Sequence, residues 1–308
     1  MNALWIDTDP GIDDALALAM ALAAAGRRLA GVGTVAGNVD VGQATRNAAL
    51  VLEDAGAPSV PLHRGAAASL IGTRADARHV HGDDGLGGTV EREPELAPAP
   101  DHAAIALIRT ARDRGPLDVL ALGPLTNLAL ALALEPRLAA HLGRVVWMGG
   151  TIAGRGNVTA AAEFNAWADP EALARVLAAG LDLTLVSWET TLEHAVPLAA
   201  LREWLDADTA LARRARAMAA HLKAAGVVTA ERGVALPDPL AAAVMIDPRC
   251  ALAAERLPMR VVLCGEARGQ TIVDRRPAPD PTGVPVRVVT RIDLDAVESL
   301  VRRAVRAG

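Results

Sequence analysis

The chain has 308 residues and a formal net charge of −5, and its 31 lysines and arginines are scattered rather than gathered in a stripe. This pattern argues against a nucleic-acid-binding protein, because such proteins present a concentrated basic surface to phosphates. The two cysteines, Cys250 and Cys264, form no CxxC motif, which argues against a zinc site or a disulfide framework and favours a reducing compartment.

The apolar stretches are too short to cross a membrane. The longest uncharged ones begin at Ala15 and Leu128 and fall short of the ~20 residues that a spanning helix needs. The first residues carry no basic segment, and acidic residues arrive before the apolar core of a signal peptide could be completed. We therefore expect a soluble, cytoplasmic protein that binds no membrane.

Four aspartates stand where the first predicted strand, at 3–8, meets a predicted helix. They are Asp7, Asp9, Asp13 and Asp14. Helix capping explains one or two of them, each contributing about 0.3–1 kcal/mol. Four ionised carboxylates in so short a segment repel one another unless a cation neutralises them, and oxygen ligands suit a hard divalent ion. The cluster therefore predicts a metal site.

Two other interpretations of the aspartate cluster stay open. In the first, the acids only cap the helix. In the second, Asp7 is the nucleophile of an Asp-x-Asp pair like that of haloacid-dehalogenase-type phosphatases, and Lys223, the only lysine, completes that site. The phosphatase interpretation leaves Asp13 and Asp14 without a role.

Predicted strands and helices alternate along the chain. After the first strand and the helix at 13–25, strands are predicted at 29–37, 117–123, 144–150 and 181–188, and helices at about 40–55, 124–135 and 170–179. The last third contains helices at about 198–225, strands at 260–265, 269–274 and 285–292, and a closing helix from Asp293. This order predicts one α/β domain over 1–308, with a mainly parallel central sheet and helices on both faces. Ligands of such sheets bind at the carboxyl ends of the strands.

Polar residues follow two of these strands. Asn38 comes directly after one strand, and Asn157, Glu163 and Asn165 lie in the loop after another. Side chains of these types exchange hydrogen bonds with hydroxyl groups, so together they suit a polyhydroxylated ligand. Taken singly, each is typical of a turn or a helix cap, and Asp169 is expected to cap the helix after it.

The motifs together resemble those of the inosine–uridine preferring nucleoside hydrolase family. The matching segments follow the family's order from about residue 3 to residue 247: DTDPGIDDALAL, VAGN, HGDDGLGG, GPLTNLALAL, MGG with GNVTAAAEFNAWADPEA, and LPDPLAAA. The first and fifth are highly specific. The resemblance implies a Rossmann-like nucleoside hydrolase fold, a homodimer or homotetramer, and an enzyme that hydrolyses the N-glycosidic bond of ribonucleosides to ribose and free base with one calcium ion.

The resemblance also implies roles for individual residues. The implied calcium ligands are Asp9, Asp14, Asp238 and the backbone carbonyl of Thr126, and Asp9 also takes a proton from the calcium-bound water. The implied ribose-binding set consists of Asp13, Asn38, Met148, Asn157, Glu163, Asn165 and Asp238. Its carboxylates would stabilise the positive charge of an oxocarbenium-like transition state. Asp7 receives no metal contact and is expected to support the loop from behind.

The chain departs from the family pattern at Pro237. Many members carry a histidine there, directly before the late calcium-binding aspartate, and that histidine protonates the leaving base. His81 is the remaining candidate acid, and Trp188 is a candidate to stack on the base. His194 and His221 are expected to be packing or surface residues.

The missing histidine leaves open a second class of function, a catalytically silent, calcium-dependent nucleoside-binding protein. Against this alternative, a mere binder has no need of the water-activating Asp9. If the protein is a hydrolase, ribose is the expected sugar, because a 2′-deoxy sugar leaves buried polar partners unpaired. The glycine-containing loop 224–234 before Asp238 is a candidate lid.

Overall fold

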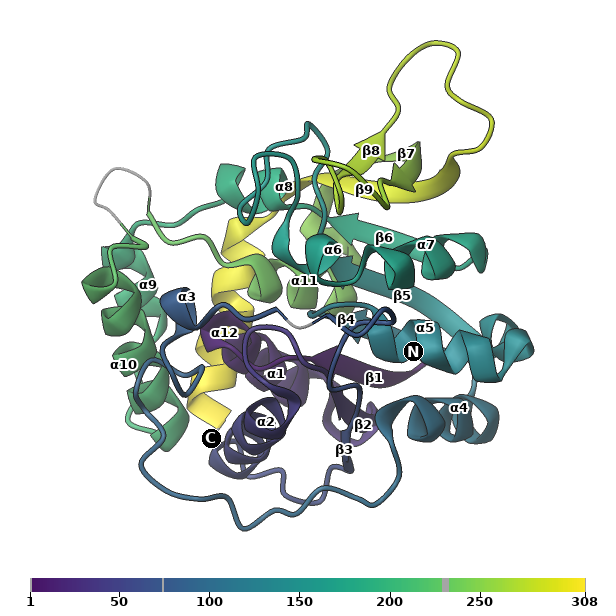
Figure 1. Ribbon diagram of the computed structural model, residues 1–308. Helices are drawn as coiled ribbons and strands as arrows, with labels where there is room; N and C mark the ends of the chain where they lie inside the picture. The colour runs from purple at the N-terminus through teal and green to yellow at the C-terminus, as the bar shows by residue number, and fades with distance from the viewer. Residues whose placement is uncertain (1, 74, 229–232, 308) are drawn as a thin grey trace.

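The computed structural model describes residues 2–73, 75–228 and 233–307 (Figure 1). The strands are β1 (Ala3–Thr8), β2 (Leu29–Thr34), β3 (Leu62–Arg64), β4 (Leu117–Ala121), β5 (Leu142–Met148), β6 (Asp182–Val186), β7 (Ala251–Val261), β8 (Thr271–Val273) and β9 (Val284–Ile292). The α-helices are α1 (Ile12–Ala25), α2 (Val41–Asp54), α3 (Arg78–His81), α4 (Ala103–Arg114), α5 (Thr126–Leu134), α6 (Phe164–Ala168), α7 (Pro170–Ala178), α8 (Trp188–Glu193), α9 (Leu198–Trp204), α10 (Ala210–Ala224), α11 (Pro237–Ile246) and α12 (Leu294–Ala307). No helix within the described residues has both the length and the apolar character that crossing a membrane requires.

The strands form one sheet in the order β3-β2-β1-β4-β5-β6-β9-β7-β8. From β3 to β9 in this order, all neighbouring strands pair in parallel. By contrast, β7 pairs antiparallel with both β9 and β8. The predicted α/β fold with a mainly parallel sheet is confirmed.

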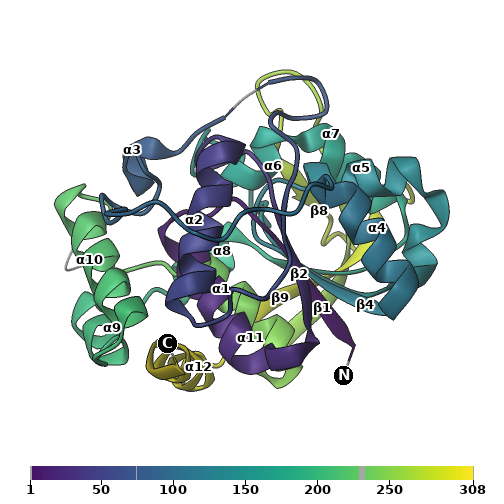
Figure 2. The ribbon, with the colours of Figure 1, turned by 90° about the horizontal axis from the view of Figure 1, so that it is seen from below.

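Helices cover both faces of the sheet, as Figures 1 and 2 show. In β1, Leu4 and Ile6 point into a core shared with α1, α2, α10, α11 and α12, whereas Trp5 points into a core shared with α4, α5 and α7. This alternation follows from the two-residue period of a strand. The helix α1 is rich in alanine, and its small buried side chains, such as Ala17 and Ala21, let α11 and α12 pack closely against it.

Asp7 lies behind the first loop, in the supporting position expected of it. Its side chain is buried, and Asn127 at the start of α5 places Nδ2 3.2 and 3.1 Å from the two carboxylate oxygens. The same nitrogen donates to the carbonyl of Thr34 at 2.9 Å. Burial raises the pKa of Asp7 to about 7. Because Asn127 engages both oxygens of Asp7 and Lys223 is exposed on α10, the structure argues against the phosphatase interpretation, in which Asp7 attacks a phosphate.

Candidate functional site

The first turn of α1 fixes the position of Asp14. This residue is fully buried and accepts hydrogen bonds from Thr8 Oγ1 at 2.5 Å, the Gly11 N–H at 3.0 Å and Asn38 Nδ2 at 3.0 Å. The sequence favours this arrangement because an acid in the third position of a helix satisfies free N–H groups at the helix start. Asp14 therefore joins the loop after β1 to the loop after β2.

Asp9 is fully buried between two glycines of neighbouring loops. Its Oδ2 accepts from the Asn38 N–H at 2.7 Å, and its Oδ1 has no partner among the described residues. A Cβ at Gly37 or Gly123 would collide with this carboxylate, so both loops need glycine to approach it. An unpaired buried oxygen costs about 1–3 kcal/mol, and more when it is charged. Asp9 Oδ1 therefore lacks, within the described residues, the partner that a buried charged oxygen needs.

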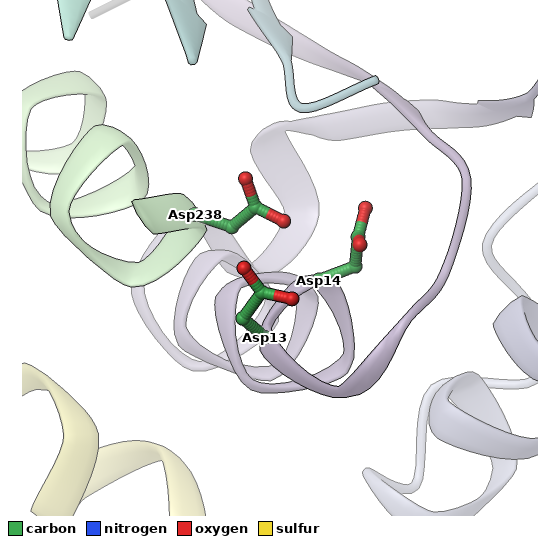
Figure 3. A group of neighbouring side chains, drawn as sticks. All are labelled: Asp13, Asp14 and Asp238. Atoms are coloured by element: carbon green, nitrogen blue, oxygen red, sulfur yellow. The ribbon is translucent and has the colours of Figure 1, made fainter. Parts of the chain in front are cut away.

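Three aspartates form a carboxylate cluster near Asp9. Oxygens of Asp13, Asp14 and Asp238 lie within 4.8 Å of one another, and Figure 3 shows the side chain from α11 facing the two from α1. Burial, and after it the repulsion between neighbouring aspartates, raises the pKa of Asp9, of Asp14 and of Asp238. These donors are buried, all of them are carboxylate oxygens, and the charged carboxylates repel one another. Such a set fits a hard divalent cation such as Ca²⁺.

The carboxylate cluster differs in membership from the implied calcium ligands. Asp14 and Asp238 are common to both, Asp13 joins them, and Asp9 stands outside the 4.8 Å group. Asp13 Oδ1 is buried and also lacks a partner in the described part of the chain. Thr126 begins α5, and its Oγ1 donates a hydrogen bond to Asp169 at 2.7 Å. Asp169 also caps α7, which is the role expected of it.

A cavity of about 510 Å³ opens beside the carboxylate cluster. The whole implied ribose-binding set lines it, namely Asp13, Asn38, Met148, Asn157, Glu163, Asn165 and Asp238. Asn38 and Asn165 use Nδ2 for hydrogen bonds within the protein, which leaves their Oδ1 acceptors for a ligand. Asn157 uses Oδ1 to accept from a backbone N–H at 2.8 Å and keeps its donors. The set thus presents both donors and acceptors to hydroxyl groups.

Glu163 is held rigidly by backbone groups. Its Oε2 accepts from the N–H groups of Gly150 at 2.7 Å and Ala166 at 3.2 Å, and its Oε1 accepts from Asn165 at 3.0 Å. Burial raises the pKa of Glu163 to about 7. The same side chain therefore caps α6 and lines the cavity, and its position is set before any ligand arrives.

His81 and Trp188 also line the cavity. His81 Nδ1 accepts from the Ile12 N–H at 3.1 Å, and burial lowers the pKa of His81 to about 4. A neutral imidazole whose Nδ1 is an acceptor carries its proton on Nε2. His194, in contrast, bonds through both ring nitrogens to backbone groups at 2.7 and 2.9 Å, so it is a packing residue, as expected. His221 lies on α10 against the HGDDGLGG loop.

The candidate lid borders the same cavity. Its residues 229–232 lie outside the described residues. Val228 and Val234, on either side of that gap, line the cavity.

Two further buried side chains, Glu189 and Asn47, organise the loops of the site. Glu189 in α8 accepts hydrogen bonds at 2.8, 2.8 and 3.2 Å from three N–H groups of loop 152–155. Asn47 in α2 donates at 2.9 and 2.8 Å to one carbonyl of the first loop and one of the HGDDGLGG loop. Glu189 follows a strand, as Asn38 does, so the same signal could have found it. Asn47 is polar on the buried face of its helix, which is a weaker signal.

Comparisons with known proteins agree with this geometry. The family model described as inosine-uridine preferring nucleoside hydrolase matches residues 4–299. The non-specific ribonucleoside hydrolase RihC of Escherichia coli is 43% identical over 190 residues, which cover 61% of this chain and 62% of that relative. The chain spans about three fifths of the length of the curated relatives it matches.

Solved structures match over the full length. A plant nucleoside hydrolase has a TM-score of 0.91 at 30% identity, covering 100% of this chain and 99% of its own. The purine-preferring ribonucleoside hydrolase of Gardnerella vaginalis has a TM-score of 0.90 at 28% identity, covering 99% of each chain. Because the family model matches almost every residue, the chain belongs to the inosine-uridine preferring nucleoside hydrolase family.

Proposed function

We propose that the protein hydrolyses the N-glycosidic bond of ribonucleosides and releases ribose and the free base. The observation that carries this proposal is one cavity with two unlike ends, carboxylates and amides at one and apolar side chains at the other. A ribonucleoside has the same two parts, a polyhydroxylated sugar and a flatter, less polar base. The names of the relatives, which include ribonucleoside hydrolases, support the same reaction.

We propose that Asp14 and Asp238 hold a calcium ion with Asp9 and the carbonyl of Thr126. A cation would relieve the repulsion that raises the pKa of each of these aspartates. The donor set supports calcium over zinc, because zinc sites draw mainly on nitrogen and sulfur ligands. When bound, the ion lowers the pKa of a water molecule and orients the sugar hydroxyls.

Asp9 is the proposed general base. Its Oδ1 lacks a partner within the described residues, so it can accept a proton without first breaking a hydrogen bond. As the glycosidic bond breaks, positive charge develops on the ribose ring. Asp13, Glu163 and Asp238 stabilise that charge more strongly than they stabilise the neutral substrate.

The leaving base receives no proton from position 237, because Pro237 has no group that could donate one. We propose that His81 donates a hydrogen bond to the base through Nε2, since its Nδ1 is already engaged with Ile12. Trp188 is proposed to pack on the face of the base.

Replacing Glu189 by glutamine is expected to raise KM about tenfold and to lower kcat by a smaller factor. The amide loses the negative charge that holds three N–H groups, so the loop leading to Asn157 moves. Glu193→Gln, on the exposed side of the same helix, is the matched control. Steady-state kinetics with melting curves test this, and an unchanged KM in the Glu189 variant would contradict it.

The proposed function is tested with inosine, uridine, cytidine and guanosine. We expect the purified protein with calcium to release ribose from at least one of them. Calorimetric binding of a nucleoside without any ribose release would instead support the silent binding protein. Release of ribose from none of the four would refute the hydrolase proposal.

We further propose a homodimer or homotetramer located in the cytoplasm. The family resemblance supports assembly, and the unpaired Cys250 and Cys264 suit a reducing compartment. Sedimentation velocity separates a dimer from a tetramer.

A further inference from the structure

The cavity continues from the carboxylate end into an apolar chamber. Its walls come from α9, the residue after it and α10, and they consist of Leu201, Leu205, Ala215, Met218, Ala219 and Leu222. All six side chains are buried and belong to one hydrophobic core. Leu16 of α1 and Leu236 before α11 line the same cavity.

Among the residues that the structure describes, the apolar chamber has no polar side chain of its own. Outside the ribose-binding set, the ionisable residues that line the cavity in the described part of the chain are His79 and His81, both on α3. A carbonyl or amino group that enters the chamber therefore gives up hydrogen bonds to water without replacing them. An alkyl group in the same place gains from leaving water.

We propose that the preferred substrates are purine ribonucleosides that carry an apolar group on the edge of the base far from the sugar. This inference rests on the proposed hydrolase function. The chamber and the ribose-binding set line one continuous cavity, so a nucleoside with its ribose at the carboxylates directs the far edge of its base into the chamber. A purine reaches farther than a pyrimidine because it has two fused rings.

The first experiment compares purine riboside with its 6-methyl, 6-ethyl and 6-propyl derivatives, and with inosine, by kcat/KM for ribose release. The three alkyl groups differ little in their electronic effect on the leaving base, so burial decides the trend. Each added methylene is expected to raise kcat/KM about fourfold, and methyl to propyl about fifteenfold. Inosine, with its polar 6-position, is expected to fall at least about tenfold below the propyl compound.

A series that stays flat or falls with chain length would overturn the proposal while leaving the hydrolase function intact, provided that inosine is cleaved. Release of ribose from none of the compounds would instead overturn the hydrolase function, and this inference with it.

The second experiment narrows the chamber. Ala219→Leu places a larger side chain on the chamber wall, and Ala220→Leu makes the same change on the exposed side of α10. We expect Ala219→Leu to lower the ratio of kcat/KM for the propyl compound to that for purine riboside by about tenfold or more. Ala220→Leu should leave this ratio within about twofold of wild type. An equal ratio in the two variants would overturn the proposal, and melting curves check that both fold.

Discussion

We expect Asp9→Asn to lower kcat/KM for ribonucleoside hydrolysis by about 10³-fold or more, within the range that a general base contributes. Asparagine has nearly the same shape, and its oxygen can still accept from the Asn38 N–H, which holds Asp9 at 2.7 Å. Its amide nitrogen cannot take a proton. Because Asp9 is also a proposed calcium ligand, the rates are compared at saturating calcium, where the loss falls on the chemical step, and initial rates of ribose release measure it.

Two further measurements separate a role in catalysis from a role in folding. Asp83→Asn changes an exposed acid near the site and should leave the rate within about twofold of wild type. In calcium-free buffer, Asp9→Asn should melt at or above the wild-type temperature, because it removes a charge that burial and neighbouring carboxylates oppose. A variant with near wild-type turnover would refute the role assigned to Asp9.

Removing calcium is expected to abolish activity and to lower the melting temperature by about 5–10 °C. An ion that binds only the folded chain stabilises it by about 4 kcal/mol when its concentration is a thousand times its Kd, and this sets the size of the shift. Asp14 and Asp238 are far apart in the sequence, on α1 and α11, and meet only in the folded protein. Melting curves before and after dialysis against a chelator test this expectation.

The effect of calcium should grow with pH. In the calcium-free protein, burial raises the pKa of Asp13 to about 6 and of Glu163 to about 7, so the folded state holds protons that the unfolded chain has already released. Stability therefore falls as pH rises from about 4 through about 7. A bound cation favours the charged carboxylates and opposes this loss. We expect a larger calcium-induced shift at pH 8 than at pH 5, and equal shifts would contradict the account.

The parallel sheet could be predicted because its strands are short apolar runs separated by helical patterns. The elements that were predicted wrongly or not at all, β7, β3 and α4, are explained by their local sequences. The strand β7 begins at Ala251, nine residues before the predicted strand at 260, because its first half, ALAAER, has the composition of a helix. The strand β3 has three residues, too few to show a period, and α4 at Ala103–Arg114 was not among the predicted helices.

The composition of the candidate site could be predicted better than its internal contacts. The family resemblance grouped Asp14, Glu163 and Asp238 in one site; Asp14 and Asp238 lie together in the carboxylate cluster, and Glu163 and Asp238 line the same cavity. The sequence could not say which way each side chain turns, so it did not predict that Asp13, rather than Asp9, would share the tightest group of oxygens with Asp14 and Asp238. Nor could it show that His81 Nδ1 accepts a backbone hydrogen bond, because that contact joins loops 69 positions apart.

We propose that one buried set of carboxylates both binds calcium and supports the hydrolysis of ribonucleosides. Calcium is titrated into chelator-treated protein while ribose release and melting temperature are both followed. Activity and stability should return together, with the same half-saturation and one ion per chain. Full ribose release in the presence of chelator, or a gain in stability without any return of activity, would contradict it.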